Sequence, residues 1–319
     1  MTQKLAVLMD PIEAINPAKD STLAMLLEAQ KRDWIIHYLV PGTLFALDGR
    51  AYAMAASLNV FDSKQCWFET SAISECALDD FDLILMRKDP PFDMEFIYSC
   101  YILDLAVAQG TLVVNNPSAL RNFNEKFSIM NFPACCAPTV VTKNITQIQS
   151  FLDRHKHLVI KPLDAMGGES IFKLSFDDPN SYSIILQLTR KGHSTVMCQR
   201  FIPEVTAGDK RILIINGEPI PHALARIPRH DDFRANLAAG GVGKSVQLSE
   251  RDYWICQQLK DTLIENGIIF AGIDIIGDYL TEINITSPTC IRELDKINAL
   301  DISALLFDQL EHILENNLA

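Results

Sequence analysis

The sequence lacks a long apolar run, and it lacks an excess of positive charge. Its first apolar run, residues 5–9, stops at Asp10 and is far shorter than the ~20 residues that a membrane span needs. The 319 residues include 28 lysines and arginines against 40 aspartates and glutamates, a formal net charge of −12. Nucleic-acid backbones and anionic membranes would repel such a chain. We therefore expect a cytoplasmic protein that binds neither nucleic acid nor membranes.

The chain also lacks grouped metal-binding cysteines and histidines. Its eight cysteines are scattered, with no C-x-x-C pair and no zinc spacing, a pattern typical of reduced core thiols. The neighbours Cys135 and Cys136 leave a vicinal disulfide as the alternative. His155 and His157 have no third ligand nearby, which favours a solvated loop over a metal pair.

Glycine is scarce in the first half of the chain, where only three of the 14 glycines precede residue 160. Apolar runs there alternate with segments of helical spacing, and Asp48-Gly49 is typical of a tight hairpin. The expected strands cover residues 5–9, 34–39, 83–87 and 112–114, and the expected helices cover 21–32 and 92–109. Alternating strands and helices predict a parallel or mixed sheet covered on both faces.

After residue 122 the pattern changes to a proline-rich connector, short helices and hairpins, including a strong turn at Asn216-Gly217. We expect a mixed α/β chain in three parts. These are an N-terminal α/β domain at 1–122, a small central domain at 123–200, and a hairpin-rich C-terminal domain at 201–319.

A glycine loop, residues 164–170, follows the apolar strand that ends at Lys161. The pair Gly167-Gly168 would let backbone N–H groups approach phosphate oxygens, and Lys161 could reach a phosphate as a point charge. A plain hairpin turn is an equally good interpretation of two glycines. Residues 170–174 alternate like a strand, whereas Rossmann and Walker loops open a helix, so neither applies.

Residues 238–245 nearly spell a Walker A loop, with Ala238 in place of the first glycine. The stretch before them is polar, and residues 246–248 do not begin a helix, so we favour a flexible substrate loop over a Walker loop. Its arginine-rich surroundings would give this acidic protein a local site for anionic ligands.

The strongest pattern is an apolar hairpin that carries three oxygen-bearing side chains. Strand periodicity places Glu282 and Asn284 on one face, and Asp274 comes from the preceding strand. Two carboxylates and an amide suit Mg²⁺ held jointly with nucleotide phosphates. The alternative is a hairpin whose polar face meets only solvent.

The metal interpretation carries a geometric prediction. Residues paired across strands share a face, and a two-residue loop at 277–278 would pair Asp274 with Thr281 and turn it away from Glu282. A shared metal needs Asp274 opposite Glu282. We therefore expect a three-residue loop, 277–279.

Several longer motifs span the chain. They are MDPI at 9–12, AMLLEAQ at 24–30, MRKDPPFD at 86–93, NEK at 124–126, KPLD at 161–164, DKR at 209–211, LARIP at 224–228, NLAAGG at 236–241 and TEINITSPTCIRE at 281–293. Together they resemble the bacterial glutathione synthetases of the ATP-grasp superfamily, from the first strand to the last helix. The resemblance implies an ATP-grasp fold, with an N-terminal α/β domain, a central lid domain and a C-terminal domain that holds the metal hairpin.

The same resemblance implies the roles of individual residues. ATP would lie between the central and C-terminal domains, and Asp274, Glu282 and Asn284 would hold Mg²⁺, with Mn²⁺ as a substitute. The nucleotide would meet Lys126, Lys161, Gly167, Gly168, Gln199, Arg200, Phe201, Ile202, Asp209 and Arg211. The peptide substrate would meet Arg87, Arg226, Arg234, Asn236, Gly240, Gly241, Ser287, Pro288, Thr289 and Arg292. Lys161, Arg211 and Arg226 would neutralise charge during catalysis.

Three positions depart from the family pattern. Ala165 and Ala235 stand where the family usually has glycine, and Arg200 replaces the usual polar amide in the adenine strand. Alanine resists a positive φ angle by about 1–2 kcal/mol. We expect these departures to affect loop conformation and closure rather than the chemistry.

The resemblance implies a ligase that joins γ-glutamylcysteine to glycine, using ATP and an acyl phosphate intermediate, in a homotetramer. Another ATP-grasp carboxylate–amine ligase, such as one that adds glutamate, is the nearest alternative. A non-catalytic nucleotide-binding relative is the other, and the complete set of three metal-ligand residues argues against it.

Overall fold

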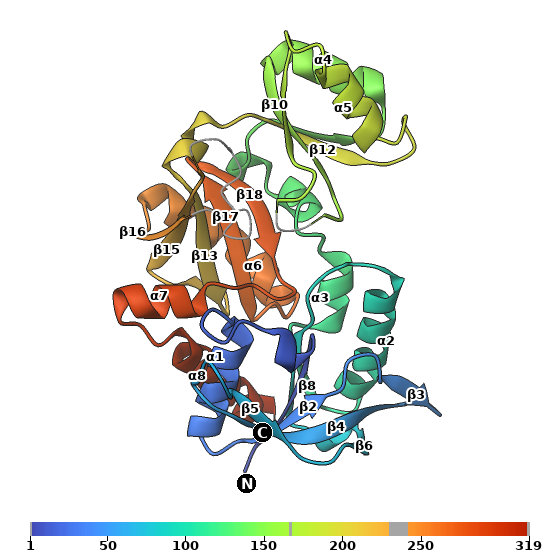
Figure 1. Cartoon of the computed structure of the whole chain (residues 1–319), viewed down its shortest axis with the longest axis vertical. Coiled ribbons are helices and arrows are strands. Elements are labelled where there is room, and N and C mark those ends of the chain that lie inside the picture. Colours follow the sequence, from blue (N-terminus) through green and yellow to red (C-terminus); the bar gives the residue numbers. More distant parts are fainter. Residues whose placement is uncertain (1, 166–167, 230–241, 318–319) are drawn as a thin grey trace.

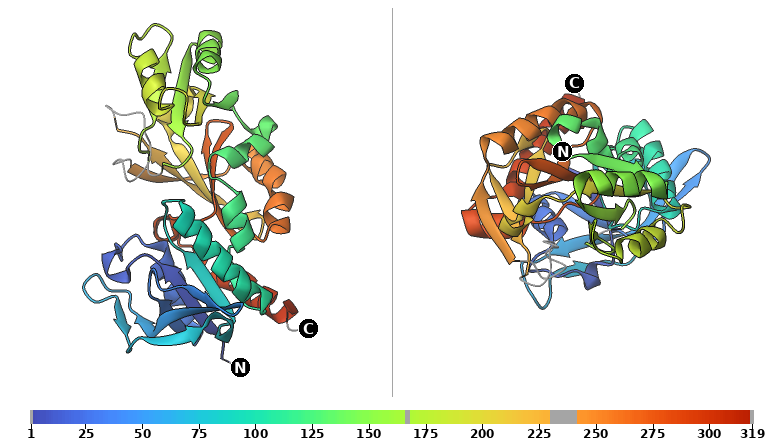
Figure 2. Two further views of the ribbon diagram at one scale, coloured as in Figure 1. Left: turned by 90° about the vertical axis from the view of Figure 1, so that its right-hand side faces the viewer. Right: turned by 90° about the horizontal axis from the view of Figure 1, so that it is seen from above.

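The computed structural model describes residues 2–165, 168–229 and 242–317. Three sheets follow one another along its long axis (Figure 1). The first sheet in the sequence lies lowest, the last lies in the middle, and the small central one lies at the top. Both termini lie at the lower end, so the chain runs up through the central part and returns (Figures 1 and 2).

The first sheet is mixed, as the alternating pattern predicts. Its strands are β1 (Lys4–Met9), β2 (Ile35–Leu39), β3 (Phe45–Leu47), β4 (Arg50–Val60), β5 (Phe68–Thr70), β6 (Ser74–Ala77), β7 (Leu83–Arg87) and β8 (Leu112–Val114). The pairs β1–β2, β1–β7 and β7–β8 are parallel, and β4 runs antiparallel to its partners. Leu47 pairs with Arg50 around Asp48 and Gly49, whose φ angles of 50° and 82° confirm the tight hairpin.

Helices cover both faces of this sheet. They are α1 (Ser21–Lys31), α2 (Met94–Ala108) and α3 (Pro117–Asn122), with a single turn at Ile12–Ala14 and another at Leu78–Asp80. The side chains of Asp20 and Asp93 cap α1 and α2 by accepting backbone N–H groups of Leu23 and Phe96. Alternate residues of β1 pack toward α1 and toward α2, which is why β1 is apolar throughout.

The central sheet is antiparallel, in the order β11-β10-β12-β9. Its strands are β9 (Thr139–Thr142), β10 (His157–Pro162), β11 (Phe172–Ser175) and β12 (Val196–Arg200), and its helices are α4 (Ile145–His155) and α5 (Ser181–Leu188). A small separate core joins them, with Ile148, Ile160 and Ile185 at its centre. Two short 3-10 helices, Phe127–Asn131 and Pro133–Cys135, lead into this sheet, where the sequence predicts a proline-rich connector and short helices.

The third sheet carries the predicted hairpins. Its strands are β13 (Asp209–Ile215), β14 (Glu218–Pro219), β15 (His222–Ile227), β16 (Val242–Gln247), β17 (Phe270–Ile276) and β18 (Tyr279–Asn284), with the helix α6 (Glu250–Glu265) and a turn at Pro203–Ala207. Lys244 and Ser245 lie within β16, which pairs with β15. Residues 242–247, which include the end of the Walker-like sequence, therefore form a strand and not the start of a helix, as expected for a segment that is not a Walker loop.

The chain ends against its own beginning. The last helices, α7 (Ile291–Asn298) and α8 (Ile302–Asn317), share one core with α1 and with the third sheet. Arg32, at the end of α1, lies 2.7 Å from Asp308 and 2.8 Å from Glu311 of α8. This packing fixes the first and third sheets relative to one another.

All eight cysteines are free thiols, including Cys135 and Cys136, so the vicinal disulfide does not form. The Cys136 thiol instead donates to the carbonyl oxygen of Ile129 at 3.3 Å. Among the described residues, no helix is long and apolar enough to cross a membrane.

Candidate active site

Five charged side chains project from one face of the third sheet. Arg211 of β13 lies opposite Asp274 of β17, which lies opposite Glu282 of β18, and Asp209 lies opposite Arg226 of β15. Opposed residues share a face, as do residues two apart in a strand. All five side chains therefore point to the same side, and the isoleucines between them fill the core on the other side.

The β17–β18 hairpin confirms the predicted parity but not the predicted loop. Ile276 pairs with Tyr279, so the loop has two residues, Gly277 and Asp278, and the predicted three-residue loop is wrong. The register then shifts between Asp274 and Ile275, which makes a β-bulge. One extra residue on β18 turns the following side chains to the other face. The bulge thereby brings Asp274 opposite Glu282.

Two arginines hold the Asp274 carboxylate. The Arg211 Nε lies 2.5 Å from its Oδ1, and the Arg226 Nη2 lies 2.9 Å from its Oδ2. Burial alone would raise the pKa of Asp274, but the two guanidinium groups outweigh it and hold that pKa well below its usual range. Asp274 is therefore ionised in this structure.

Asp209 is the second carboxylate of this ion-pair network. Its Oδ2 lies 2.6 Å from the Arg226 Nη2. Burial raises the pKa of Asp209 to about 7, because the Arg226 charge only partly offsets the loss of water and the neighbouring Asp274 adds to the rise. Asp209 and Asp274 thus lie side by side with opposite protonation tendencies.

Gly272 has no side chain, and this leaves space for the ion-pair network beside it. A Cβ atom at this position would lie 2.9 Å from the Arg211 Cδ and 3.0 Å from the Pro288 Cβ. Any side chain there would displace either the arginine or the turn that carries Pro288. The glycine is thus required for close approach rather than for an unusual φ angle.

Asn115, just after β8, ties the first sheet to this hairpin. Its amide nitrogen donates to the carbonyl oxygens of Phe270 and Ile285 at 2.7 and 2.6 Å. Its amide oxygen accepts the N–H groups of Ile269 and Phe270, each at 2.9 Å. One buried side chain therefore fixes the start of β17 against the end of β18.

Two lysines reach the hairpin from the central part of the chain. The Lys161 Nζ lies 3.4 Å from the Glu282 Oε1 and 3.2 Å from the carbonyl oxygen of Thr281. The Lys126 Nζ donates to the carbonyl oxygen of Ala165 at 2.5 Å. Both lysines are buried. Lys161 is in direct contact with the β17–β18 hairpin, and Lys126 lines the same cavity as Glu282.

Glu125 is a site residue that the sequence patterns did not single out, although it lies in the NEK motif. Its carbonyl oxygen accepts the N–H of Ile283 at 2.8 Å, and its carboxylate lies 3.8 Å from the Lys126 Nζ. Burial raises the pKa of Glu125 to about 7, and the nearby Glu282 charge contributes to the rise.

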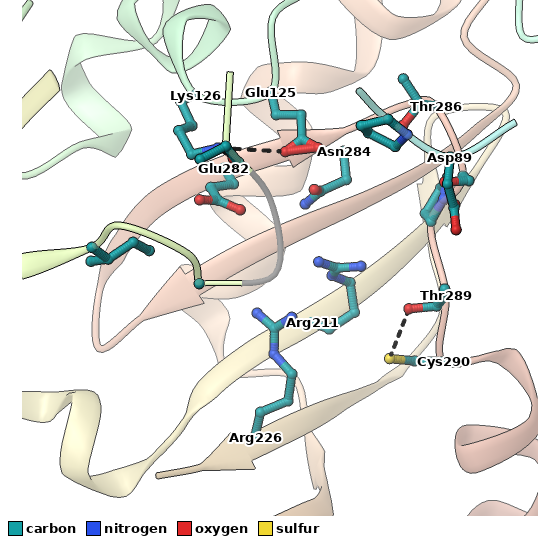
Figure 3. A pocket seen from close by; sticks show the side chains of 16 residues that line it. Asp89, Glu125, Lys126, Arg211, Arg226, Glu282, Asn284, Thr286, Thr289 and Cys290 are labelled. Atoms are coloured by element: carbon teal, nitrogen blue, oxygen red, sulfur yellow. Dashed lines mark hydrogen bonds and ion pairs between the residues drawn. The ribbon is translucent and has the colours of Figure 1, made fainter. Parts of the chain in front are cut away.

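These elements surround a cavity of about 270 Å³ (Figure 3). Residues expected at the site line it: Lys126, Gly168, Arg211, Arg226, Glu282, Asn284, Ser287, Pro288 and Thr289. The wall also contains residues that were not expected: Asp89, Pro90, Glu125, Ala165, Ile171, Thr286 and Cys290. Arg211 and Arg226 point into it from below in the view of Figure 3, with Lys126 and Glu282 across from them.

Two expected substrate residues, Arg87 and Arg292, do not line the cavity. The buried Arg87 donates to the carbonyl oxygen of Pro288 at 2.8 Å and to Thr22, and burial lowers its pKa to about 10. Arg292 lies at the start of α7, 2.9 Å from Asp62. As the structure stands, Arg87 supports the Ser287–Thr289 turn from behind, and Arg292 joins α7 to the first sheet.

The expected adenine strand lies in the central sheet, away from this cavity wall. The Gln199 amide donates to Thr139 at 3.1 Å, the Arg200 guanidinium lies over the Tyr279 ring at 5.3 Å, and Phe201 lies under the Lys173 ammonium at 4.0 Å. Ile202 is buried. Gly167, Arg234, Asn236, Gly240 and Gly241 lie outside the described residues.

The donor atoms fit a hard divalent cation. Glu282 and Asn284 both line the cavity. The Asn284 amide nitrogen donates to the carbonyl oxygen of Gly272 at 3.1 Å and lies 3.4 Å from the Asp274 Oδ2, so its amide oxygen is the atom that could bind a cation. Among the described residues, no three His, Cys, Asp or Glu side chains form a metal site. The set therefore consists of two carboxylates and one amide, and the Asp274 carboxylate is occupied by arginines.

Two family models match most of the chain. The model for "Prokaryotic glutathione synthetase, N-terminal domain" matches residues 3–121, and that for "Prokaryotic glutathione synthetase, ATP-grasp domain" matches residues 125–299. The chain belongs to the prokaryotic glutathione synthetase family. A glutathione synthetase from Xanthomonas campestris pv. campestris is 50% identical over 311 residues, 98% of each chain. One from Pseudomonas aeruginosa is 49% identical over 308 residues, 97% of each chain.

Solved structures share the fold at low identity. D-cycloserine synthetase DcsG superposes with a TM-score of 0.66 at 14% identity, covering 96% of this chain and 99% of its own. The ATP-grasp ligase PsnB, solved with a precursor peptide and AMPPNP, gives a TM-score of 0.62 at 15% identity over 99% of each chain. This glutathione synthetase family member therefore has the ATP-grasp fold, and the family is one of ATP-dependent ligases that use a divalent metal.

Proposed function

We propose that this chain joins γ-glutamylcysteine to glycine, with conversion of ATP to ADP and phosphate. The observation that carries the proposal is family membership over nearly the whole chain. A cavity lined by Lys126, Arg211, Arg226, Glu282 and Asn284 supports it, with Asp274 and Lys161 in contact with its lining residues. The alternatives, a ligase for another amine or a binding-only relative, lack a specific observation in their favour.

The cysteinyl carboxylate would attack the γ-phosphorus of ATP, which releases ADP and forms an acyl phosphate. The glycine amine would then attack the activated carbonyl carbon, and inorganic phosphate would leave. Both steps need positioning and charge neutralisation rather than a protein nucleophile. Arg211 and Arg226 would orient the carboxylate and the transferred phosphoryl group, since both point into the cavity.

Mg²⁺ is the metal we propose, with Mn²⁺ as a substitute, because the oxygen donors are hard and would be shared with phosphates. When bound, it supplies charge stabilisation at the phosphoryl oxygens. Glu282 and Asn284 would hold it at the cavity wall, and Asp274 would join them once an arginine ion pair opens. Lys126 and Lys161 would contact phosphate oxygens, and residues 199–202 would border adenine.

Three further expectations stay proposals. The domains would run over 1–122, 123–200 and 201–319, each holding one of the three sheets. A reducing, ATP-rich cytoplasm would suit a thiol substrate. The homotetramer is supported by exposed apolar residues on α2, whose outer face has Met94, Tyr98 and Tyr101 about half exposed.

Phosphate release tests the function. The purified chain is incubated with ATP, Mg²⁺ and γ-glutamylcysteine, with and without glycine, and glutathione is measured by mass. We expect glycine-dependent phosphate release that matches glutathione formation. Phosphate release with another amine but not with glycine would point to the alternative ligase, and no turnover with any amine would point to a binding protein.

A further inference from the structure

Among the described residues, three carboxylates line the cavity, and they differ in their partners. Glu282 lies 3.4 Å from the Lys161 Nζ, and Glu125 lies 3.8 Å from the Lys126 Nζ. Asp89 forms no ion pair with any residue in the described part of the chain. The Arg87 charge acts on it only from a longer distance than an ion pair. A cavity carboxylate without a close ion-pair partner is complementary to a cationic group on a ligand.

Asp89 is held in place before any ligand binds. It lies two residues after β7, its backbone N–H donates to the Asp10 Oδ2 at 2.8 Å, and the Ser287 hydroxyl donates to its Oδ1. An ionised carboxylate has about four acceptor positions on its two oxygens, so acceptor positions remain for a ligand. In Figure 3, Asp89 lies on the far side of the cavity from Lys126 and Glu282.

The proposed substrate carries one ammonium group. The reacting cysteinyl carboxylate of γ-glutamylcysteine would lie by the arginines and the metal-ligand residues, and the free α-ammonium is at the other end of the dipeptide. Resting on the proposed function, we propose that Asp89 binds this α-ammonium and makes the enzyme selective for peptides that carry it. Glycine is the less suitable cation, because a carboxylate that kept its amine protonated would suppress the attack on the acyl phosphate.

The selectivity would be of the order of one charge-assisted hydrogen bond. Such bonds contribute more than neutral ones, which corresponds to a preference of about 10- to 100-fold for a ligand that carries the charged partner. The preference would fall mainly on the KM or the dissociation constant of the dipeptide, because the ammonium is remote from the reacting carbonyl.

A cycle of two substrates and two proteins tests this. The substrates are γ-glutamylcysteine and glutarylcysteine, which replaces the α-ammonium with hydrogen. The proteins are the wild-type chain and Asp89→Asn, whose amide oxygen still accepts the Ser287 hydroxyl. We expect the wild type to prefer γ-glutamylcysteine by about 10- to 100-fold in kcat/KM, and Asp89→Asn to prefer it by less than about 3-fold. The KM values for ATP and glycine stay near wild type.

The controls separate charge from structure. Asp89→Glu keeps the charge and retains part of the preference, and Glu95→Gln, an exposed change outside the cavity on α2, behaves as wild type. Thermal melting checks folding, and Asp89→Ser replaces Asp89→Asn if the latter does not fold. Calorimetric binding of both peptides reads the preference without turnover.

The outcomes are distinct. An undiminished preference in Asp89→Asn overturns the inference, and so does loss of the preference in Glu125→Gln instead, which would place the ammonium there. Failure of the wild type to form glutathione from γ-glutamylcysteine is a failure of the proposed function. It appears before any variant is compared.

Discussion

At the scale of single residues, Glu282 is the point where charges from three parts of the chain meet. Lys161 approaches it from the central sheet, Asp274 lies opposite it on β17, and Glu125 approaches from the segment after α3. Two of these neighbours are acidic, and the cavity beside them is where ATP phosphates would lie. Lys161 balances only part of this negative charge, so we expect a metal cation to bind at Glu282 when the phosphates are present.

Glu282→Gln keeps the side-chain shape and removes that charge. We expect turnover to fall by about 100-fold or more, because the metal that neutralises the phosphoryl oxygens is bound less well. The melting temperature should stay close to the wild-type value, and Glu69→Gln, an exposed change on β5, should leave turnover unaffected. Near-normal turnover in folded Glu282→Gln would remove this residue from the proposed metal site.

Glu125 predicts a pH dependence of stability. Its pKa rises from an ordinary value of 4.5 to about 7 in the folded chain, so between these values the folded state binds a proton that the unfolded state releases. The contribution of this group to the free energy of unfolding is greatest below about pH 4.5. It is lost as the pH rises toward 7, by at most about 1.4 kcal/mol per pH unit. Asp209 acts in the same direction.

The test is urea unfolding of the metal-free protein between pH 5 and pH 8. The wild type should lose stability across this range, and Glu125→Gln should lose less, with the remainder due to Asp209. Equal slopes in the two proteins would show that Glu125 titrates normally.

Some residues of the candidate site could be predicted from the sequence, and others could not. Lys126, Arg211, Arg226 and Glu282 line the cavity as expected. Asp89 went unrecognised although it lies in the quoted MRKDPPFD motif, because its chemistry depends on Ser287, which lies 198 residues away. Distant partners leave no mark in local spacing.

At the scale of elements, the sequence predicted the relative orientation of Asp274 and Glu282 in the β17–β18 hairpin correctly, but it predicted the wrong loop length. The two-residue period of a strand determines which residues share a face, and the metal hypothesis required Asp274 opposite Glu282. Loop length was inferred from an unbroken ladder. The ladder is broken by a bulge next to Asp274, so the shorter loop gives the same parity. Bulges depend on the twist and neighbours of the whole sheet, which the local pattern does not contain.

Asn115 makes a prediction about the same hairpin. Asn115→Asp replaces two N–H donors with an acceptor that faces the carbonyl oxygens of Phe270 and Ile285. We expect a loss of about 3 kcal/mol or more, because a buried charge or unpaired carbonyls result. Urea unfolding measures it, and Asn116→Asp, which keeps the oxygen that caps α3, is the neighbouring control. A loss below about 1 kcal/mol in Asn115→Asp would mean that these four bonds do not support the hairpin.

At the scale of the whole molecule, the cavity must exclude water once the acyl phosphate forms. The segments at 164–170 and 229–243 are rich in glycine and poor in large apolar residues, so the sequence predicts that they gain order over bound substrates. Residues 166–167 and 230–241 of these segments lie outside the described residues. Hydrogen exchange with and without ATP and γ-glutamylcysteine measures this, with α6 as the internal reference. Equal protection of both segments in the two states would refute it.

The exposed face of α2 carries few charges and several large apolar side chains. Only Glu95 and Asp104 are charged among the 15 residues of α2, and its exposed Met94, Tyr98 and Tyr101 repeat at intervals of four and three, as in the seam of a helix pair. A second copy of this chain is the partner that such a seam fits, since two α2 helices would match their uncharged stripes.

We therefore expect the double change Tyr98→Glu and Tyr101→Glu to lower the mass measured by light scattering to a half or a quarter of the wild-type value. Two like charges would then face each other across the seam, and an uncharged stripe would no longer be buried. Turnover should remain, because α2 does not line the cavity. Tyr253→Glu, at a comparably exposed tyrosine on α6, should leave the mass unchanged. An unchanged mass in the double variant, or a fall in the α6 control instead, would place the interface on another face of the molecule.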